Sequence, residues 1–299
     1  MISWLGAIEM GLVYGIVAIA VFLSFRVLNF PDLTIDGSFP LGAAAAASLI
    51  VRGVDPLAAT AAAFAAGAVA GAFTAFLNLR FGILHLLASI LTMTGLYSIN
   101  LRVMGAPNVA LLSEPSVLTL VTRFAIPQSY GKVLVAAIAA GVASALVTRW
   151  LVSEHGLGVR AVGANPRMAL ANGVSKSGAI CLGLGVSNGL GAVAGALFAQ
   201  LNGFADVTMG SGTIVVGLAA VILGEVLLRP RSITAAIFAC IVGSVSYRVV
   251  MQIALNTDVM GLNPSDLNLL TAMLVVGILA LPQLKTAAQR EWSRGRARK

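Results

Sequence analysis

Long apolar runs alternate along the chain with short polar stretches, and several runs approach or exceed the roughly 18–20 residues that cross a bilayer. The pattern predicts spans at about 4–25, 38–51, 56–78, 83–104, 131–150, 179–201, 213–228, 232–255 and 266–282. The segments 38–51 and 213–228 are short for a full crossing, so a re-entrant segment is an alternative for one of them. We therefore expect an all-α, polytopic transmembrane helical bundle of eight or nine spans, forming a single domain over residues 1–284.

Composition excludes a soluble protein, because 59% of the residues are hydrophobic, 10% are charged and the mean hydropathy is +0.96. Small residues at GxxxG spacing let membrane helices pack closely, and such pairs occur at Gly67/Gly71 and Gly191/Gly195. Both cysteines, Cys181 and Cys240, fall inside apolar runs, so we expect buried free thiols and no disulfide framework. The first run lacks a basic start and an A-x-A site, which indicates a retained span.

Charge placement predicts the orientation. The net charge is +8, and six of the 19 basic residues lie in the tail 285–299, which reads as a cytoplasmic anchor near anionic lipid, not as a nucleic-acid site. With this tail inside, the basic loop 151–178 also falls inside. The loops 105–130, 202–212 and 256–265 then fall outside, and the last two carry acids and no Lys or Arg. The distribution predicts an outside N-terminus and a cytoplasmic C-terminus.

An internal repeat links two polar interruptions. Residues 28–38 read LNFPDLTIDGS and residues 201–211 read LNGFADVTMGS. With one gap on each side, the Leu-Asn pair, a Phe, an Asp, a Thr and the Gly-Ser pair match. Because the copies are five predicted spans apart, they have opposite orientations, so the halves 4–104 and 179–282 form an inverted repeat with interrupted helices. The alternative is a chance likeness between two polar loops.

Interrupted helices in corresponding positions point to the binding site of a transporter built from repeats. Pro31 and Gly37 break regular helix, and freed backbone groups are tolerated only inside protein or beside a wet cavity. The alternative for Asp36 or Ser38 is an ordinary N-cap of the next span. The candidate path residues are Asn29, Phe30, Asp32, Thr34, Asp36, Ser38, Asn202, Phe204, Asp206 and Thr208.

The longest polar interval predicted inside reads EHGLGVRAVGANPRMALANGVS over residues 154–175. Asn165 can cap a short helix that begins at Pro166. A short helix between turns suits docking into the groove of a partner, and a solvated connector is the alternative.

This loop resembles that of bacterial ABC-transporter permeases of the branched-chain amino acid and ribose importer superfamily. The stretch GLVYGIVAIAVFLSFRVLNFPDLTIDGSFPLGAA (11–44) is similar to the same superfamily, and its NFPDLTIDGS form looks closest to the tryptophan/tyrosine-type subgroup. The resemblance implies a permease homodimer in the bacterial inner membrane, with ABC ATPase subunits inside and a solute-binding protein outside. By analogy, the ATPase would contact Arg160, Gly163, Asn165, Pro166 and Arg167. Ala164 and Met168 are not diagnostic.

ATP chemistry is expected on a partner. The only Gly-Lys pair, Gly131-Lys132, is followed by Val133 and not by Ser or Thr, so no phosphate-binding loop is present. The chain is expected to need no cofactor, with ATP and Mg²⁺ on the ATPase subunit. His85 is expected to be packed and not a metal ligand, Glu225 to pair with Arg229 or Arg231, and Arg248 to be functional or to extend toward the interface.

Two classes of function stay open. The first is the membrane subunit of an ATP-driven importer for a small organic solute, an amino acid of aromatic or branched-chain type. The second is a secondary transporter that binds protons or sodium at Asp32, Asp36 and Asp206. A docking loop favours the first class, since a secondary carrier needs none. An intramembrane enzyme lacks paired catalytic groups.

Overall fold

The computed structural model describes residues 2–119, 127–256, 273 and 276–277. Apart from three residues, the predicted span 266–282 lies outside the described residues, as do nearly all of the loop 256–265 and the whole tail 285–299. The long helices are α1 (Ile2–Val21), α3 (Pro56–Phe81), α4 (His85–Met104), α6 (Gln128–Val152), α9 (Lys176–Asn202) and α11 (Ile233–Asn256). The shorter ones are α2 (Ile35–Val51), α7 (Glu154–Ala164), α8 (Pro166–Ala171) and α10 (Thr213–Leu228).

The all-α membrane bundle predicted from the sequence is confirmed. Six described helices are long and apolar enough to cross a membrane, and the apolar helices α2 and α10 are shorter. The element bounds fall within a few residues of the predicted spans. Two features were not predicted: the helix α7, and a two-stranded antiparallel sheet of β1 (Asn108–Ala110) and β2 (Phe204–Asp206).

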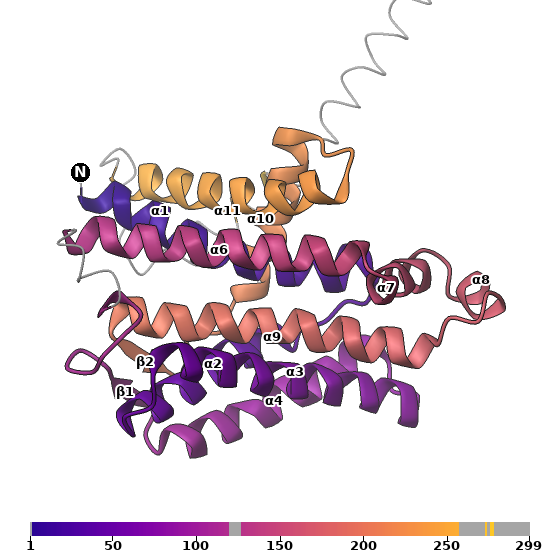
Figure 1. Cartoon of the computed structure of the whole chain (residues 1–299), viewed down its shortest axis with the longest axis horizontal. Helices are drawn as coiled ribbons and strands as arrows, with labels where there is room; N and C mark the ends of the chain where they lie inside the picture. Colours follow the sequence, from indigo (N-terminus) through magenta and orange to yellow (C-terminus); the bar gives the residue numbers. More distant parts are fainter. Residues whose placement is uncertain (1, 120–126, 257–272, 274–275, 278–299) are drawn as a thin grey trace, which may run out of the picture.

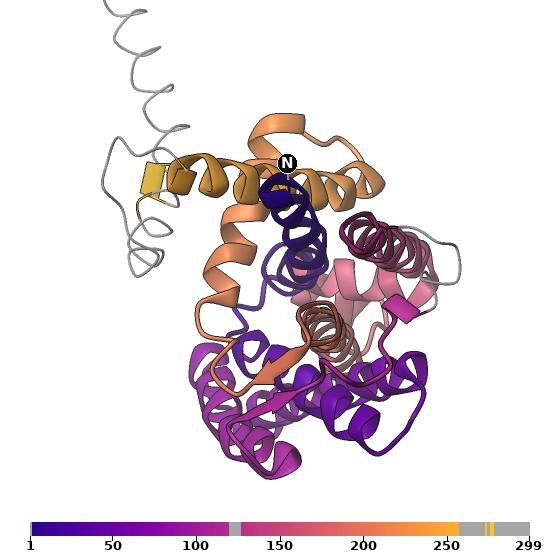
Figure 2. The same ribbon diagram turned by 90° about the vertical axis from the view of Figure 1, so that its left-hand side faces the viewer.

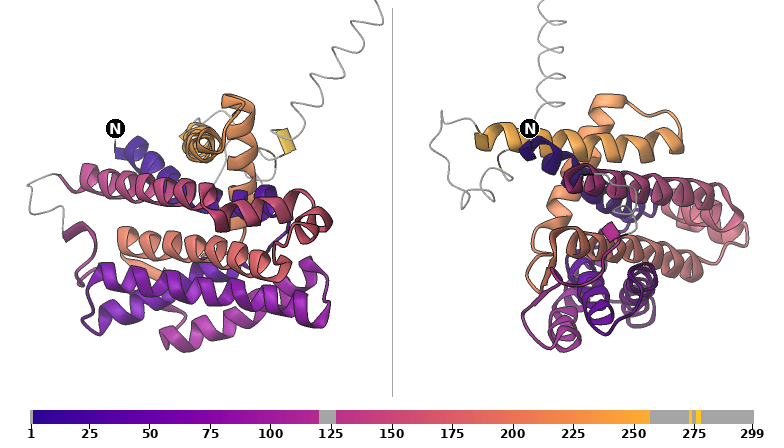
Figure 3. Two further views of the ribbon diagram at one scale, coloured as in Figure 1. Left: turned by 45° about the vertical axis from the view of Figure 1, so that its right-hand side comes forward. Right: turned by 60° about the vertical axis from the view of Figure 1, so that its left-hand side comes forward.

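The helices form two layers with α9 between them (Figure 1). Helices α1, α6 and α11 lie on one side of α9, and α2, α3 and α4 lie on the other. Helix α10 leads from the second layer to the first (Figure 2). The short helices α7 and α8 lie at one end of the bundle and the β1–β2 sheet lies at the other, as both views of Figure 3 also show. We call these the α7–α8 end and the β1–β2 end.

Close backbone approach holds α9 in the centre. A Cβ atom added to Gly71 would lie 2.1 Å from the Leu184 carbonyl oxygen, and one on Gly195 would lie 1.9 Å from that of Phe39. The same holds for Gly42, at 1.9 Å from the Ala192 oxygen. The predicted small-residue contacts are thus confirmed at α3 and α9, because no larger side chain fits between these backbones.

Several single-residue expectations meet direct observations. Cys240 is a buried free thiol, as predicted, whereas Cys181 is only half-buried. Arg248 places its guanidinium 4.0 Å from the ring centroid of Tyr14 in a cation–π contact. The expected pairing of Glu225 is wrong. Its carboxylate contacts the Arg26 guanidinium at 2.5 Å instead of Arg229 or Arg231, because the last turns of α10 lie beside the segment that follows α1.

Candidate functional site

The first break (residues 28–38) enters the bundle from the α7–α8 end. Helix α1 continues into the π-helix η1 (Phe22–Val27), and the chain reverses at Asn29, whose φ is 54°. Leu28 lies beside Gly183 of α9, whereas Asp32 bonds to Asn188, more than one helical turn further along. Helix α2 therefore begins inside the bundle, where Ile35 is fully buried.

Asp32 is the centre of a buried hydrogen-bond network. Its side chain is 0% exposed; Oδ1 accepts the Thr34 N–H at 2.9 Å and Oδ2 accepts the Asn188 amide at 2.6 Å. The same Asn188 accepts the Ser38 hydroxyl at 2.8 Å, so one side chain of α9 holds both sides of the break. Thr34 bonds to Thr74 of α3 at 2.8 Å. These contacts fix the irregular backbone where lipid and water are absent.

Phe30 and the α7–α8 end are packed together. Phe30 is 1% exposed and its ring stacks on His85 with centroids 4.1 Å apart, so His85, the exposed first residue of α4, packs one ring face on Phe30. Val159 and Val162 of α7 belong to the same apolar cluster as Phe30. A Cβ on Gly163 would lie 1.9 Å from the Val27 oxygen, so α7 rests directly on the start of the first break.

The second break (residues 201–211) lies at the β1–β2 end and leads into α10. Asp206 pairs with Asn108 across the small sheet. Its Oδ1 accepts the Thr208 amide at 2.7 Å and the Thr208 hydroxyl at 2.5 Å, and Oδ2 accepts the Asn108 amide at 3.2 Å. Hydrogen bonds from the Thr208 hydroxyl and amide, and from Asn108, hold the pKa of the Asp206 carboxyl below its usual value. The same Asp-x-Thr turn occurs at Asp32, so the two breaks share a local structure.

The two breaks meet at Asp36. Its Oδ1 accepts the Ile214 N–H at 2.7 Å and its Oδ2 accepts the Gly212 N–H at 3.3 Å. A Cβ on Gly210 would lie 2.0 Å from the Asp36 carbonyl oxygen. The sequence left open whether Asp36 caps its own helix; it caps α10, the helix that follows the second break. The shorter helices α2 and α10 therefore start side by side.

A cavity of 460 Å³ opens beside this meeting point, between α2, α4 and the loop before α10. Its polar groups include Asn100, whose amide nitrogen donates to the Gly37 carbonyl at 3.2 Å. The other amide atom, Oδ1, is buried and has no partner among the described residues. The lining residues are Asp36, Gly37, Pro40, Met93, Thr94, Tyr97, Asn100, Val207, Thr208, Ser211 and Gly212.

The predicted path residues divide into two groups. Asp36 and Thr208 line the cavity, whereas Phe30, Asp32, Thr34 and Ser38 are buried in protein contacts. Asn29 is exposed at the α7–α8 end; Phe204 is 39% exposed, and Asn202, Phe204 and Asp206 lie at the β1–β2 end.

The residues of α4 that line the cavity were missed. Their signal was nevertheless present, because Thr94, Tyr97 and Asn100 recur every three residues inside an apolar span and so share roughly one helix face.

The predicted coupling residues also separate. Asn165 caps α8, as predicted, and its Oδ1 accepts the Met168 N–H at 3.1 Å. Arg167 is exposed, whereas Gly163 faces η1. Met168 and Leu170, which the sequence did not single out, are 65% and 53% exposed on α8.

Sequence similarity to known proteins gives independent evidence on the family of this chain. Residues 4–281 match the family model of the permease component of branched-chain amino acid transport systems. The chain is 34% identical over 288 residues to the tyrosine transport system permease protein of Clostridioides difficile (strain R20291), covering 93% of this chain and 91% of that protein. It is 32% identical over 275 residues to an uncharacterised protein of Rickettsia prowazekii (strain Madrid E), covering 90% and 94%. No solved structure matches the chain.

Proposed function

Because this chain belongs to the family of permease components of branched-chain amino acid transport systems, we propose that it forms the translocation path of an ATP-binding-cassette importer. It is a transport subunit and not a catalytic enzyme. One observation carries the path proposal: the shorter helices α2 and α10, each preceded by a polar break, start side by side at Asp36, next to a 460 Å³ cavity that is lined in part by polar groups. Such discontinuous helices form substrate sites in transporters built from repeats.

The path is assigned to the cavity residues and not to every candidate. Asp36, Thr94, Tyr97, Asn100 and Thr208 supply its polar groups. The unpartnered Oδ1 of Asn100 can accept a hydrogen bond from an ammonium group, and Tyr97, 51% exposed, offers an aromatic face. This set suits a zwitterionic cargo with an apolar side chain. We assign an amino acid of aromatic type as cargo, and the description of the clostridial relative as a tyrosine transport permease supports this choice.

Ion coupling, the second class considered, is less well supported. A cation needs several free oxygen ligands at one place. Both oxygens of Asp36 already accept backbone N–H groups, and Asp32 and Asp206 lie at different places with neutral donors on both oxygens. In the described part of the chain, no three His, Cys, Asp or Glu side chains form a metal-binding group.

Helix α8 is assigned as the docking site for an ATPase subunit, which would hold ATP and Mg²⁺. Its exposed Met168 and Leu170, with Arg167 beside them, form an apolar and basic tip that a groove can accept. Behind it, α7 contacts η1 through Gly163. Movement of the α8 tip would therefore reach the first break through α7 and η1.

The cavity side of the bundle is assigned to the interface with a second permease copy. Tyr97 is 51% exposed in the middle of α4, and lipid does not satisfy an exposed hydroxyl at such depth. A second copy placed over this face would close the cavity into a channel between protomers. With the C-terminus on the cytoplasmic side of the bacterial inner membrane, the β1–β2 end would face an extracytoplasmic solute-binding protein.

Reconstitution tests these assignments. The permease is placed in proteoliposomes with a candidate ABC ATPase and a candidate solute-binding protein from the same organism, and uptake of labelled tyrosine is measured with and without ATP. We expect uptake that requires ATP and binding protein and persists when ionophores remove ion gradients. Uptake that stops with the ion gradient and ignores ATP would establish the carrier instead.

A matched pair of variants tests docking. Leu170→Glu places a charge on α8, whereas Leu112→Glu makes the same exchange at an 85% exposed site in the loop after β1. Only Leu170→Glu should abolish co-purification of the ATPase. Equal retention of the ATPase by both variants would remove α8 as its docking site.

A further inference from the structure

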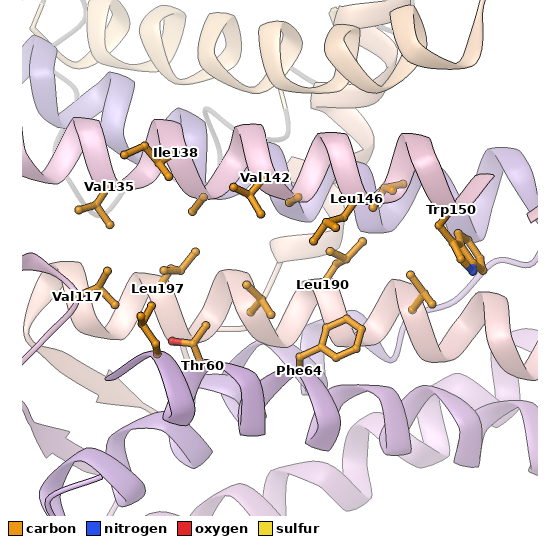
Figure 4. Close-up of a pocket in the computed structure, with 16 residues that line it drawn as sticks. Thr60, Phe64, Val117, Val135, Ile138, Val142, Leu146, Trp150, Leu190 and Leu197 are labelled. Atoms are coloured by element: carbon orange, nitrogen blue, oxygen red, sulfur yellow. The ribbon is translucent and has the colours of Figure 1, made fainter. Parts of the chain in front are cut away.

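A second cavity, unrelated to the path, runs along the side of the bundle between α6 and α3, with α9 as its floor (Figure 4). Its volume is 710 Å³. Figure 4 shows Val135, Ile138, Val142, Leu146 and Trp150 of α6 along one rim. We call this cavity the lateral groove. It shares no helix with the 460 Å³ cavity, which α2, α4 and the loop before α10 enclose.

The lateral groove offers almost nothing to a polar ligand. Of its sixteen lining side chains only Thr60 and Trp150 carry a polar atom. The Thr60 hydroxyl already donates to the Pro56 carbonyl at 2.8 Å and accepts the Gln200 amide at 2.9 Å. A solute with charged groups would lose its hydration here without compensation. The groove therefore suits hydrocarbon.

Its dimensions and position match a lipid chain. From Val135 to Trp150 the rim follows α6 for roughly 22 Å at 1.5 Å per residue. One leaflet supplies about half of a roughly 30 Å hydrocarbon core, so an acyl chain fits lengthwise. The groove is bounded by α3, α6 and α9, which are all candidate membrane spans, and it opens sideways where a membrane places lipid chains.

The end marked by Trp150 suits a head group. Trp side chains favour the membrane–water interface, where the ring is apolar and the N–H can meet polar groups. Arg149, which directly precedes Trp150 in the chain, is exposed and forms no ion pair within the described part of the chain. A phosphate at this end would thus find a cation, while its chain follows the groove toward Val135.

We propose that the lateral groove binds one acyl chain of a membrane phospholipid, with the head group at the Trp150 end. The site is independent of the proposed transport function. A second protein copy fits this place less well, since the exposed polar groups that need cover lie on α4, which does not line the groove. The bound chain would fill the space between α6, which packs on α1, and α3 and α9.

Tryptophan fluorescence tests the proposal. The chain has three Trp residues, so Trp4→Phe with Trp292→Phe leaves Trp150 as the only fluorophore. Phospholipid brominated near the head group is titrated into the protein in detergent, beside the same lipid brominated at the chain end. We expect saturable quenching of Trp150, at least twofold stronger with bromine near the head group. Quenching that rises linearly with lipid, or is equal for both bromine positions, would overturn the proposal.

Filling the groove provides the matched control. Ala139 lines it, whereas Ala145 is exposed on the same helix and does not. Ala139→Phe should reduce saturable quenching at least fivefold and remove one phospholipid from the mass of the detergent-solubilised protein; Ala145→Phe should change neither. Val142→Phe, at a 52% exposed rim position, repeats the test should Ala139→Phe not fold. Unchanged lipid retention, or loss of a bound protein copy without loss of lipid, would contradict lipid occupancy.

Discussion

The first break and the second break have similar sequences but differ in burial and in their neighbours. Each follows a long helix, contains an Asp-x-Thr turn and leads into one of the shorter helices, α2 or α10. The first lies inside the bundle with Asp32, Thr34 and Ser38 all 0% exposed, while the second has Phe204 and Thr208 exposed and is joined to a strand. The repeated sequence thus specifies a turn, and the neighbouring elements decide its role.

The neighbours differ because the chain is not symmetric around the two breaks. Helix α9 passes beside the first break and offers Asn188 to Asp32, whereas the second break finds Asn108 of β1 at the surface. Asp36 has no acidic counterpart in the second copy, so capping between the breaks runs in one direction, from Asp36 to α10. The first break is held by buried contacts with α9 and α3, and the second is held by β1 and by Asp36.

The largest difference should appear on removing the two matched aspartates. Asp32→Ala leaves the Thr34 N–H and the Asn188 amide buried without their acceptor, which should lower the free energy of unfolding by about 3 kcal/mol. Asp206→Ala exposes its donors to water and should cost less than about 1 kcal/mol. Denaturant titration in mixed micelles measures both.

Asp32→Asn separates shape from charge. An inverted Asn188 amide can still bond to Asn at this position and to the Ser38 hydroxyl but gives up its bond to the Leu184 carbonyl, so the loss should be smaller than that of Asp32→Ala. An equal loss in the free energy of unfolding for Asp32→Ala and Asp206→Ala would show that burial does not distinguish the two breaks.

Contact between the breaks is tested next at Gly210. Gly210→Ala would bring a Cβ within 2.0 Å of the Asp36 oxygen and 2.6 Å of Pro40, so the breaks must separate, at a cost of about 1–3 kcal/mol. Gly95→Ala, where nothing lies within 4 Å, is the control and should be neutral or slightly stabilising. Cysteine cross-linking between α2 and the loop before α10 should weaken in Gly210→Ala alone; unchanged cross-linking would refute this close approach.

A smaller effect is expected from the cap that Asp36 provides. Asp36→Ala should cost about 1 kcal/mol and speed hydrogen exchange at the Gly212 and Ile214 amides. Asp55→Ala removes a cap that also accepts two backbone amides, those of Leu57 and Ala58 on Oδ1, from the first turn of α3, the helix that Asp55 itself precedes. Both variants should lose similar stability, but only Asp36→Ala should alter uptake. A loss of uptake in both would mean that transport reports stability alone.

The smallest effect concerns acid. The pKa of Asp206 is lowered in the folded protein by Thr208 and Asn108, so its contribution to stability is present above the unfolded pKa of roughly 3.9 and is lost as pH falls through the lower folded value. The protection of amides around β1 and β2 against hydrogen exchange, relative to an unstructured chain at the same pH, should therefore be constant near neutrality and fall only below about pH 4. Asp206→Asn should abolish this fall. A fall in protection near neutral pH would assign the transition to another group.

The sequence predicted the bounds of most helices within a few residues, but it did not predict which side chains contact one another. The interval 213–228 was predicted with the bounds of α10, and the helix beginning at Pro166 with its Asn165 cap was also confirmed. Helix α7 was missed because residues 154–164 include three glycines, which disfavour a helix in the absence of tertiary contacts. Glu225 was assigned to nearby arginines, whereas its partner Arg26 is 199 positions away. Local signals describe local structure, and distant pairs have none.

By itself, the sequence determined the helical class, the positions of the described long apolar helices and the two polar interruptions, because bilayer thickness and helix-breaking residues act on contiguous stretches. Only the tertiary structure decided that Asp32 is fully buried, that Asp36 caps α10 and that α4 lines the cavity. Those outcomes depend on which helix passes beside each break, and that is set by backbone contacts at residues such as Gly71 and Gly195, far apart in the chain.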